Sequence, residues 1–225
     1  MIRIERRQTD KADLAIKDLQ KAKAKHTTYN TENVNAALHE IFHGKCYICE
    51  NKNGSSYQIE HLIPHHGKEE LKYDWNNLFW ACAHCNNTKS GCDDLILDCT
   101  KEDVDQRIAF RKEGYFGTTE RFVFVPLDEH EDTQNTVTLL QNAYYGTTPQ
   151  KKIEARILRK QLRENVSKFK SYIRDYEDLE QGSEEKEDLE ILIKRELSEK
   201  SEFTAFKRWL IRDNEKLAEF LKYCD

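Results

Sequence analysis

The chain has 225 residues, enough for one sizeable domain or two small ones at about 100 to 200 residues each. Charged residues make up 34% and hydrophobic residues 38%, which predicts a lean core under a heavily ionised surface. The mean hydropathy of −0.87 suits a disordered chain, but 10 Tyr, 10 Phe and 3 Trp are too many aromatic residues for that class. We therefore expect a folded protein with polar helices.

The net charge of −5 on its face argues against a nucleic-acid ligand, but the charges are segregated along the chain. Residues 151–174 hold nine Lys and Arg against two acids, whereas residues 175–190 hold nine acids against one Lys. The longest apolar run, residues 78–83, is too short for a membrane helix, which needs about 20 residues. The first residues show no apolar signal region. These features predict a cytoplasmic protein with no membrane contact.

The first segment, residues 1–44, predicts two helices. The first runs over Gln8–His26, and Thr31 caps a second helix that ends at Gly44. Apolar residues recur near helical spacing in the first helix at Leu14, Ile16, Leu19 and Ala22.

The cysteines indicate a metal site. Four of the seven form two C-x-x-C pairs, which are Cys46 with Cys49 and Cys82 with Cys85. An odd total without a secretion signal argues against a disulfide framework. Two such turns can place four thiolates around one tetrahedral zinc ion, in a closed site that has a structural role. The alternative is a coincidental pairing of buried cysteines. The other three, Cys92, Cys99 and Cys224, are expected to be reduced thiols of unassigned role.

The segment between the two cysteine pairs carries the polar residues of a candidate site. Its sequence predicts a strand over Tyr57–Ile63, a loop, a short strand over Leu78–Ala81 and a helix that starts at Asn86. Within it lie an acid-His pair followed by two apolar residues and Pro, an Asn before Leu, and C-x-x-C-Asn with a Lys three residues on. The corresponding residues are Glu60, His61, Pro64, Asn77, Asn86 and Lys89.

This order of elements resembles the HNH endonucleases of the four-cysteine branch, whose fold is a zinc-pinned ββα-metal unit. Hydrolysis of a phosphodiester needs a base for the attacking water and a metal that neutralises charge. His61 has a suitable intrinsic pKa for the base. Glu60 and Asn86 offer hard oxygen ligands for catalytic Mg²⁺ or Mn²⁺. The resemblance further implies that Asn77 fixes the loop and orients His61; Lys89 could contact a phosphate or be an ordinary helix charge.

Two features leave questions open. Asp is commoner than Glu at the acid position of the family, and consecutive strand residues point to opposite sides, so Glu60 and His61 share a site only if the backbone bends. The three histidines nearby are expected in exposed loops, although one of them could touch a metal or a phosphate. These are His65, His66 and His84.

The remainder of the chain predicts a small strand region followed by helices. Strands are expected over Arg121–Leu127 and Thr136–Leu140. A helix starts at Thr148 and Pro149, and a further helix is expected over Ser183–Lys200. The first of these carries an apolar stripe of Ile153, Ile157, Leu158, Leu162, Val166, Phe169 and Ile173. A last helix holds Phe203, Phe206, Trp209 and Leu210.

The expected fold is α+β, with residues 1–44 as a helical segment, residues 45–100 as the zinc-stabilised nuclease core, and residues 101–225 as strands and helices for partner docking or nucleic-acid contact. The layout, including Asp74-Trp75 before Asn77 and Phe203 to Trp209 near the end, resembles the HNH component of Septu-type and retron-associated antiphage defence systems. That resemblance implies an ABC/SMC-like ATPase partner and a DNA substrate. An RNA-cleaving toxin and a non-catalytic zinc module that binds nucleic acid are the alternatives.

Overall fold

The computed structural model describes residues 1–114 and 120–224, and within these ranges four of the α-helices have a side-chain cap at their N-terminus. Thr9 caps α1 (Asp10–Ala24) and Thr31 caps α2 (Glu32–Ile41), as each hydroxyl accepts a hydrogen bond from the backbone N–H three residues on. The predicted start of the second helix is therefore confirmed. In α1 the sequence stripe is partly wrong, because Leu14 is 47% exposed and the small Ala12 and Ala15 are buried instead.

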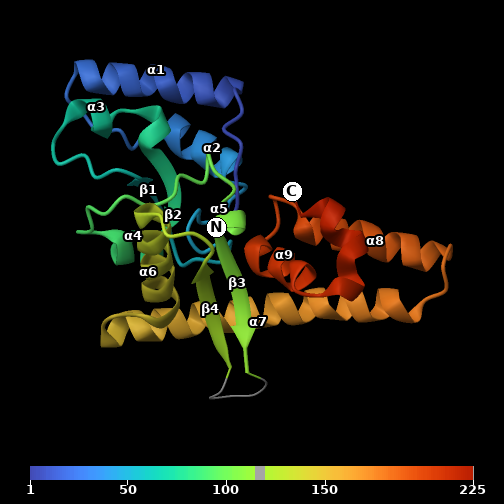
Figure 1. Cartoon of the computed structure of the whole chain (residues 1–225). Coiled ribbons are helices and arrows are strands. Elements are labelled where there is room, and N and C mark those ends of the chain that lie inside the picture. The colour runs from blue at the N-terminus through green and yellow to red at the C-terminus, as the bar shows by residue number, and fades with distance from the viewer. Residues whose placement is uncertain (115–119, 225) are drawn as a thin grey trace.

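The segment between the cysteine pairs folds as an antiparallel hairpin followed by a helix. Strand β1 (Tyr57–His61) pairs with β2 (Leu78–Cys82), and α3 (Glu69–Lys72) and a single 3₁₀ turn, η1 (Trp75–Asn77), lie in the connection. Helix α4 (Ala83–Lys89) follows directly (Figure 1). The ββα order is as predicted, but β1 ends at His61 rather than Ile63, and α4 begins three residues before Asn86. The second cysteine pair therefore spans the end of β2 and the first turn of α4.

The next region differs more from the sequence prediction. A short helix, α5 (Val104–Arg107), leads into β3 (Ile108–Glu113), which pairs with the expected strand β4 (Arg121–Pro126). The predicted strand Thr136–Leu140 is wrong, because these residues lie inside α6 (Glu131–Tyr145). Tertiary packing explains the difference: Val137, Leu139 and Leu140 are buried in the core, and the buried Thr136 hydroxyl accepts a hydrogen bond from the Leu97 N–H and donates to the Asp132 carbonyl. A β-branched run therefore sits on a buried helix face.

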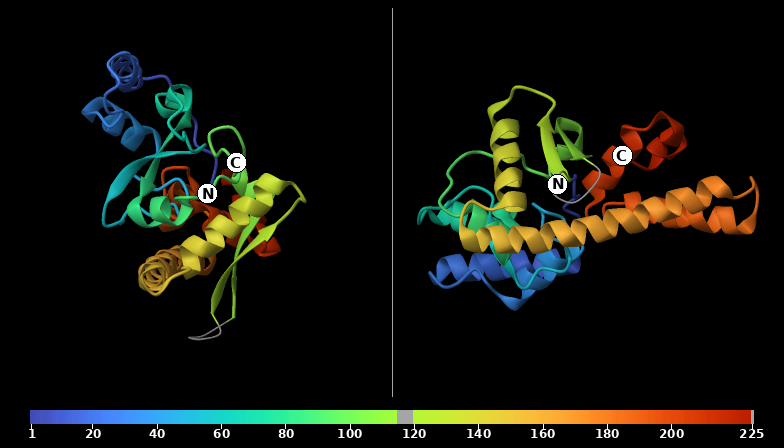
Figure 2. Two further views of the ribbon diagram at one scale, coloured as in Figure 1. Left: turned by 90° about the vertical axis from the view of Figure 1, so that its left-hand side faces the viewer. Right: turned by 90° about the horizontal axis from the view of Figure 1, so that it is seen from below.

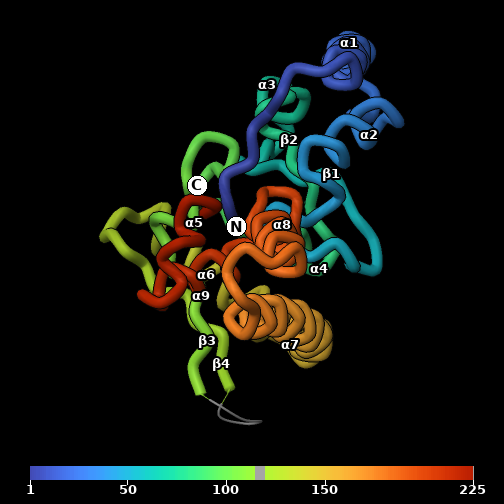
Figure 3. The backbone as a smooth tube through the Cα atoms, turned by 90° about the vertical axis from the view of Figure 1, so that its right-hand side faces the viewer, coloured from blue at the N-terminus to red at the C-terminus, as the bar shows by residue number. Residues whose placement is uncertain are grey.

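The C-terminal region is helical, as predicted. Thr148 caps α7 (Pro149–Asp178), and Ser183 caps α8 (Glu184–Leu197), which runs back beside it. Helix α9 (Thr204–Arg212) and the 3₁₀ segment η3 (Glu215–Tyr223) close this end, as Figures 2 and 3 show. The expected stripe of α7 begins too early, because Ile153 and Ile157 are 59% and 56% exposed, whereas the residues from Leu158 onward are buried.

One hydrophobic cluster joins all three predicted segments. It contains Ile4 and Leu38 from the first, Phe79 from the second, and Phe124 and Phe206 from the third. A second, smaller cluster lies between α7, α8, α9 and η3. The lean core expected from composition is therefore shared along the chain, so the ββα unit is supported by helices on both sides of it in sequence. Within the described ranges, no helix combines the length and apolar character that a membrane crossing requires.

Candidate active site and zinc centre

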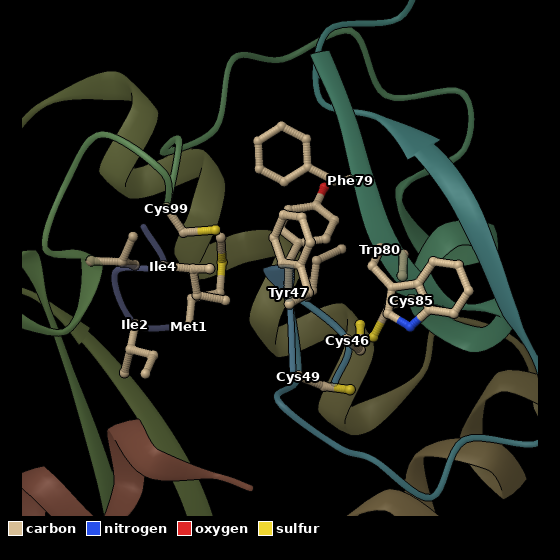
Figure 4. Close-up of a cluster of buried hydrophobic side chains, with 14 of the residues drawn as sticks. Met1, Ile2, Ile4, Cys46, Tyr47, Cys49, Phe79, Trp80, Cys85 and Cys99 are labelled. Atoms are coloured by element: carbon tan, nitrogen blue, oxygen red, sulfur yellow. The ribbon is translucent and has the colours of Figure 1, made fainter. Parts of the chain in front are cut away.

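The four paired cysteines come together at one point. Their ligand atoms all lie within 4.8 Å of one another and all four residues are buried; they are Cys46, Cys49, Cys82 and Cys85. The Sγ atoms of Cys49 and Cys82 are 3.9 Å apart, close to the edge of about 3.8 Å that a tetrahedral zinc-thiolate site requires. Figure 4 shows three of these cysteines, Cys46, Cys49 and Cys85, gathered on one side of Tyr47. The donor set and spacing fit a structural zinc ion.

Two of the four thiols, Cys49 and Cys85, resist ionisation, whereas the pKa of Cys46 lies well below its usual value because hydrogen bonds with the neighbouring cysteines outweigh the effect of burial. Burial is the main cause that raises the pKa of Cys49 well above its usual value, and hydrogen bonds from neighbouring cysteines, Cys46 foremost, raise the pKa of Cys85. Four clustered thiolates repel one another, so a dication is needed to hold them together as ligands. Among the described residues, these cysteines are the one cluster of three or more His, Cys, Asp or Glu side chains placed to hold a metal.

His61 is held in a defined orientation at the end of β1. Its Nε2 lies 3.0 Å from the Lys72 carbonyl oxygen, and because a carbonyl only accepts, Nε2 carries the hydrogen. Nδ1 therefore carries the lone pair, and no group in the described ranges bonds to it. The rings of Tyr29 and His65 lie edge-on to the imidazole, with centroids 4.8 and 4.7 Å away. Burial lowers the pKa of His61, so the ring is neutral at neutral pH and can accept a proton.

Asn77 ties the loop that follows His61 to the start of β2. Its Oδ1 accepts a bond of 2.8 Å from the Ile63 N–H, and its Nδ2 donates to the carbonyls of Ile63 and Leu71 at 2.8 and 3.0 Å. The Asn77 carbonyl also accepts the Leu62 N–H. These bonds hold the chain just after β1 to the chain just before β2, and the bond to Leu71 fixes the segment whose Lys72 carbonyl reaches the imidazole. They are the contacts that an orienting role for Asn77 requires.

Replacing Asn77 by Ala is expected to lower both stability and nuclease rate. Three partly buried backbone groups, the Ile63 N–H and the carbonyls of Ile63 and Leu71, lose their partner, at a cost of up to about 1–3 kcal/mol for each group that water does not reach. The loop that carries the Lys72 carbonyl loses its anchor, and any cleavage for which His61 is the base should slow by about tenfold or more. Thermal melting and cleavage assays measure the two effects. The exposed neighbour Asn76, whose side chain makes no bond to a described residue, is the matched control, and Asn76→Ala should leave both unchanged.

Glu60 points into the protein, away from the His61 ring. Its Oε1 lies 2.7 Å from the Lys89 ammonium, and its Oε2 accepts a bond of 2.6 Å from the Tyr47 hydroxyl. The Glu60 side chain is only 6% exposed, and burial raises its pKa although Lys89 opposes that shift. The carboxylate therefore already has a cation beside it. Tyr47 was not singled out in the sequence, although its position inside the first C-x-x-C turn places it in the core.

Lys89 and Asn86 lie one turn apart on α4, as expected, and both contact β1. Lys89 was considered as a phosphate contact or a solvated charge, but its side chain is 4% exposed and also donates to the His61 carbonyl at 2.9 Å. Asn86, one turn earlier on α4, donates from Nδ2 to Gln58 Oε1 at 2.6 Å. Its Oδ1 makes no hydrogen bond to the described part of the chain and is available as an oxygen ligand.

The nearby histidines have separate environments. His84 is not in an exposed loop as expected: it lies on α4, with Nδ1 2.7 Å from Glu154 Oε2 and Nε2 2.7 Å from the Ala143 carbonyl. It therefore ties α4 to α6 and α7. His66 is exposed and lies 2.8 Å from Asp93, and His65 accepts a bond from the Gly67 N–H. Of the three, His65 is the one that contacts the His61 ring.

Comparison with known proteins agrees with this geometry. Residues 46–91 match the HNH endonuclease family, and this stretch includes every cysteine of the zinc centre together with His61. The chain is 27% identical over 150 aligned residues to the Septu protein PtuB of Bacillus mycoides (strain KBAB4). The alignment covers 47% of this chain and 51% of the relative. The chain spans about half the length of that curated relative. The predicted resemblance to HNH endonucleases and to Septu proteins is confirmed, whereas the retron link stays a prediction.

Proposed function

We propose that the chain is a metal-dependent endonuclease that hydrolyses phosphodiester bonds, with DNA as its preferred substrate, in an antiphage defence system. The observation that carries the proposal is the held imidazole: the Lys72 carbonyl fixes the His61 hydrogen on Nε2 and leaves Nδ1 as a base. This arrangement lies inside the stretch that matches the HNH endonucleases. A module that only binds nucleic acid has no need of an oriented, neutral histidine.

His61 performs the proton transfer in this proposal. Its Nδ1 takes a proton from a water molecule as the water oxygen bonds to phosphorus, and the bond from phosphorus to the leaving oxygen breaks. The Lys72 carbonyl stabilises the imidazolium that forms, because it accepts a hydrogen bond from Nε2. Asn77 holds the loop that supplies this carbonyl. The leaving oxygen is reprotonated from solvent.

Glu60 and Asn86 would hold the catalytic Mg²⁺ or Mn²⁺. Carboxylate and amide oxygens are ligands that these ions prefer. The Lys89 ammonium, 2.7 Å from Glu60, occupies a position beside this carboxylate where a positive charge is favourable. When bound, such an ion neutralises charge on the phosphate and on the leaving oxygen. The closed zinc centre has no open position for substrate, so its role is structural.

The pH dependence of cleavage should follow His61. Burial lowers its pKa below the usual value of 6.5, and the base is active only when neutral. Activity is therefore lost as the pH falls through this lowered pKa, and the acid limb of kcat/KM should have its midpoint below pH 6.5. Rates measured from pH 5 to 8 on one substrate test this. A midpoint above pH 6.5 would show that the pKa of the base is raised rather than lowered, contrary to the burial of His61.

The choice between DNA and RNA is tested by cleavage of matched substrates. Duplex DNA, single-stranded DNA and RNA of one sequence are incubated with the protein and Mg²⁺ or Mn²⁺. Faster cleavage of DNA supports the proposal, and faster cleavage of RNA would favour the toxin-like alternative. The same phosphodiester chemistry serves both polymers, and contacts to the 2′-hydroxyl distinguish them.

We further propose that the helices after residue 148 dock an ABC/SMC-like ATPase. Helix α7 exposes Ile153 and Ile157 in its first turns. Its later turns extend well past the ββα unit (Figure 2). Support for the partner comes from the likeness to a Septu protein, over about half of each chain. Co-expression with an ATPase from the same genomic neighbourhood should yield a stable complex. Ile153→Glu with Ile157→Glu should weaken that complex, and full retention would place the docking surface elsewhere.

A further inference from the structure

The buried ion pair between Lys89 and Glu60 lies at the carboxylate assigned above to the catalytic metal. Both carboxylate oxygens are already engaged, Oε1 by the Lys89 ammonium at 2.7 Å and Oε2 by the Tyr47 hydroxyl at 2.6 Å. The side chains of Glu60 and Lys89 are 6% and 4% exposed, so water does little to screen their charges. A divalent cation that approaches Glu60 therefore meets a positive charge at close range.

Lys89 has a second acceptor that allows it to leave Glu60. Its ammonium also donates to the His61 carbonyl at 2.9 Å, and a lysine has three hydrogens to donate. It is the last residue of α4, and the next turn contains Gly91, where an added Cβ would meet nothing within 4 Å. The backbone that follows α4 therefore has free space around Gly91. An ammonium that moves off Glu60 can keep the His61 carbonyl or turn toward a phosphate.

We propose that Lys89 occupies the cation position at Glu60 when no divalent metal is bound and thereby sets the metal affinity of the site. This inference rests on the proposed function, because it takes Glu60 as a metal ligand. In the absence of metal, the ammonium neutralises a buried carboxylate that would otherwise be unpaired, at a large energetic cost. On metal entry the ammonium must leave Glu60. Lys89 is therefore a positioning residue that opposes metal binding and also supports the carbonyl of His61.

The test is Mn²⁺ binding to the full chain with its zinc centre filled, in the absence of nucleic acid. Titration is followed by calorimetry and by electron paramagnetic resonance of free Mn²⁺. Lys89→Met removes the competing charge and should tighten Mn²⁺ binding by about tenfold or more, the effect expected of one close like charge. Lys160→Met is the matched control, because the exposed Lys160 ammonium lies near Glu164 on α7 and not at Glu60, and its binding should equal that of the wild type.

The outcomes separate this inference from the nuclease proposal. Equal or weaker Mn²⁺ binding by Lys89→Met, with zinc content and melting temperature checked, overturns it. Lys89→Gln gives the same reading if the Met variant does not fold. Glu60→Gln should abolish the tight site, and unchanged binding by Glu60→Gln would remove Glu60 from the metal and overturn the inference as well. Cleavage that depends on His61 would still support the nuclease in either case.

Discussion

His61→Ala should lower the cleavage rate by about 10²- to 10⁴-fold, the usual contribution of a general base. The variant removes the Nδ1 lone pair, and no other imidazole in the described ranges has its Nε2 held by a backbone carbonyl in the same loop. The side chain is largely buried beside Tyr29, so a modest loss of stability is also expected. Single-turnover rates on a phosphodiester substrate, with enzyme in excess over substrate, measure the chemical step directly.

His66→Ala is the control for that experiment. His66 is an exposed histidine in the same loop, and its side chain contacts Asp93 rather than His61. It should cleave at the rate of the wild type. His61→Ala should retain about one zinc per chain, because none of the four cysteines bonds to the imidazole. Wild-type cleavage by His61→Ala would refute the assignment of the base.

Cys85→Ala should release the zinc and unfold the ββα unit. Structural zinc sites contribute about 10–16 kcal/mol of binding free energy, more than the stability of a typical domain. Cys85 lies in the first turn of α4, fully buried, so its loss disconnects β2 and α4 from the turn that holds Cys46. Metal analysis of the purified protein and circular dichroism melting measure the two effects. Prolonged treatment with a strong zinc chelator should reproduce them in the wild type.

Cys92→Ala is the matched control. Cys92 lies seven residues beyond Cys85, is only partly buried, and takes no part in the zinc cluster. It should keep both the zinc and the melting temperature of the wild type. A Cys85→Ala protein that keeps one zinc per chain and melts normally would show that the four cysteines do not form a metal centre.

The zinc centre and the ββα order were predictable because short-range rules determine them. Two C-x-x-C turns can serve one tetrahedral ion, and the sequence between them alternates strand and turn residues. The caps at Thr31, Thr148 and Ser183 were readable for the same reason, since each hydroxyl bonds to a backbone group three residues away. Composition alone argues against a nucleic-acid ligand, whereas the two cysteine pairs and the polar residues between them favour one.

The contacts inside the site were not predictable from the motif. The Lys72 carbonyl that orients His61 is a backbone group, so the identity of residue 72 carries no signal for it. Lys89 reaches Glu60 only because α4 begins at Ala83 and packs on β1, which turns Lys89 inward. Alternation along β1 indicates that Glu60 and His61 face opposite ways, as they do in this structure, so the metal-bound site that we propose requires β1 to bend at His61.

Tertiary packing also explains the errors outside the site. Thr136–Leu140 reads as a strand because β-branched residues favour sheets, but here the run covers the core as part of α6. The stripe of α7 was extended to Ile153 and Ile157 because spacing does not reveal where the neighbouring elements end. Both errors arise because packing against neighbouring elements, which the local sequence does not show, determines the secondary structure and the burial of these residues.

The central claim is that this chain hydrolyses phosphodiester bonds with a divalent metal and His61. The most direct measurement is cleavage of supercoiled plasmid DNA by the zinc-loaded wild type, alone and in complex with the ATPase proposed as its partner, in Mg²⁺ or Mn²⁺ with and without EDTA. The account predicts nicked or linear product that EDTA prevents and that His61→Ala does not form. Intact plasmid under every one of these conditions, together with intact RNA, would contradict it.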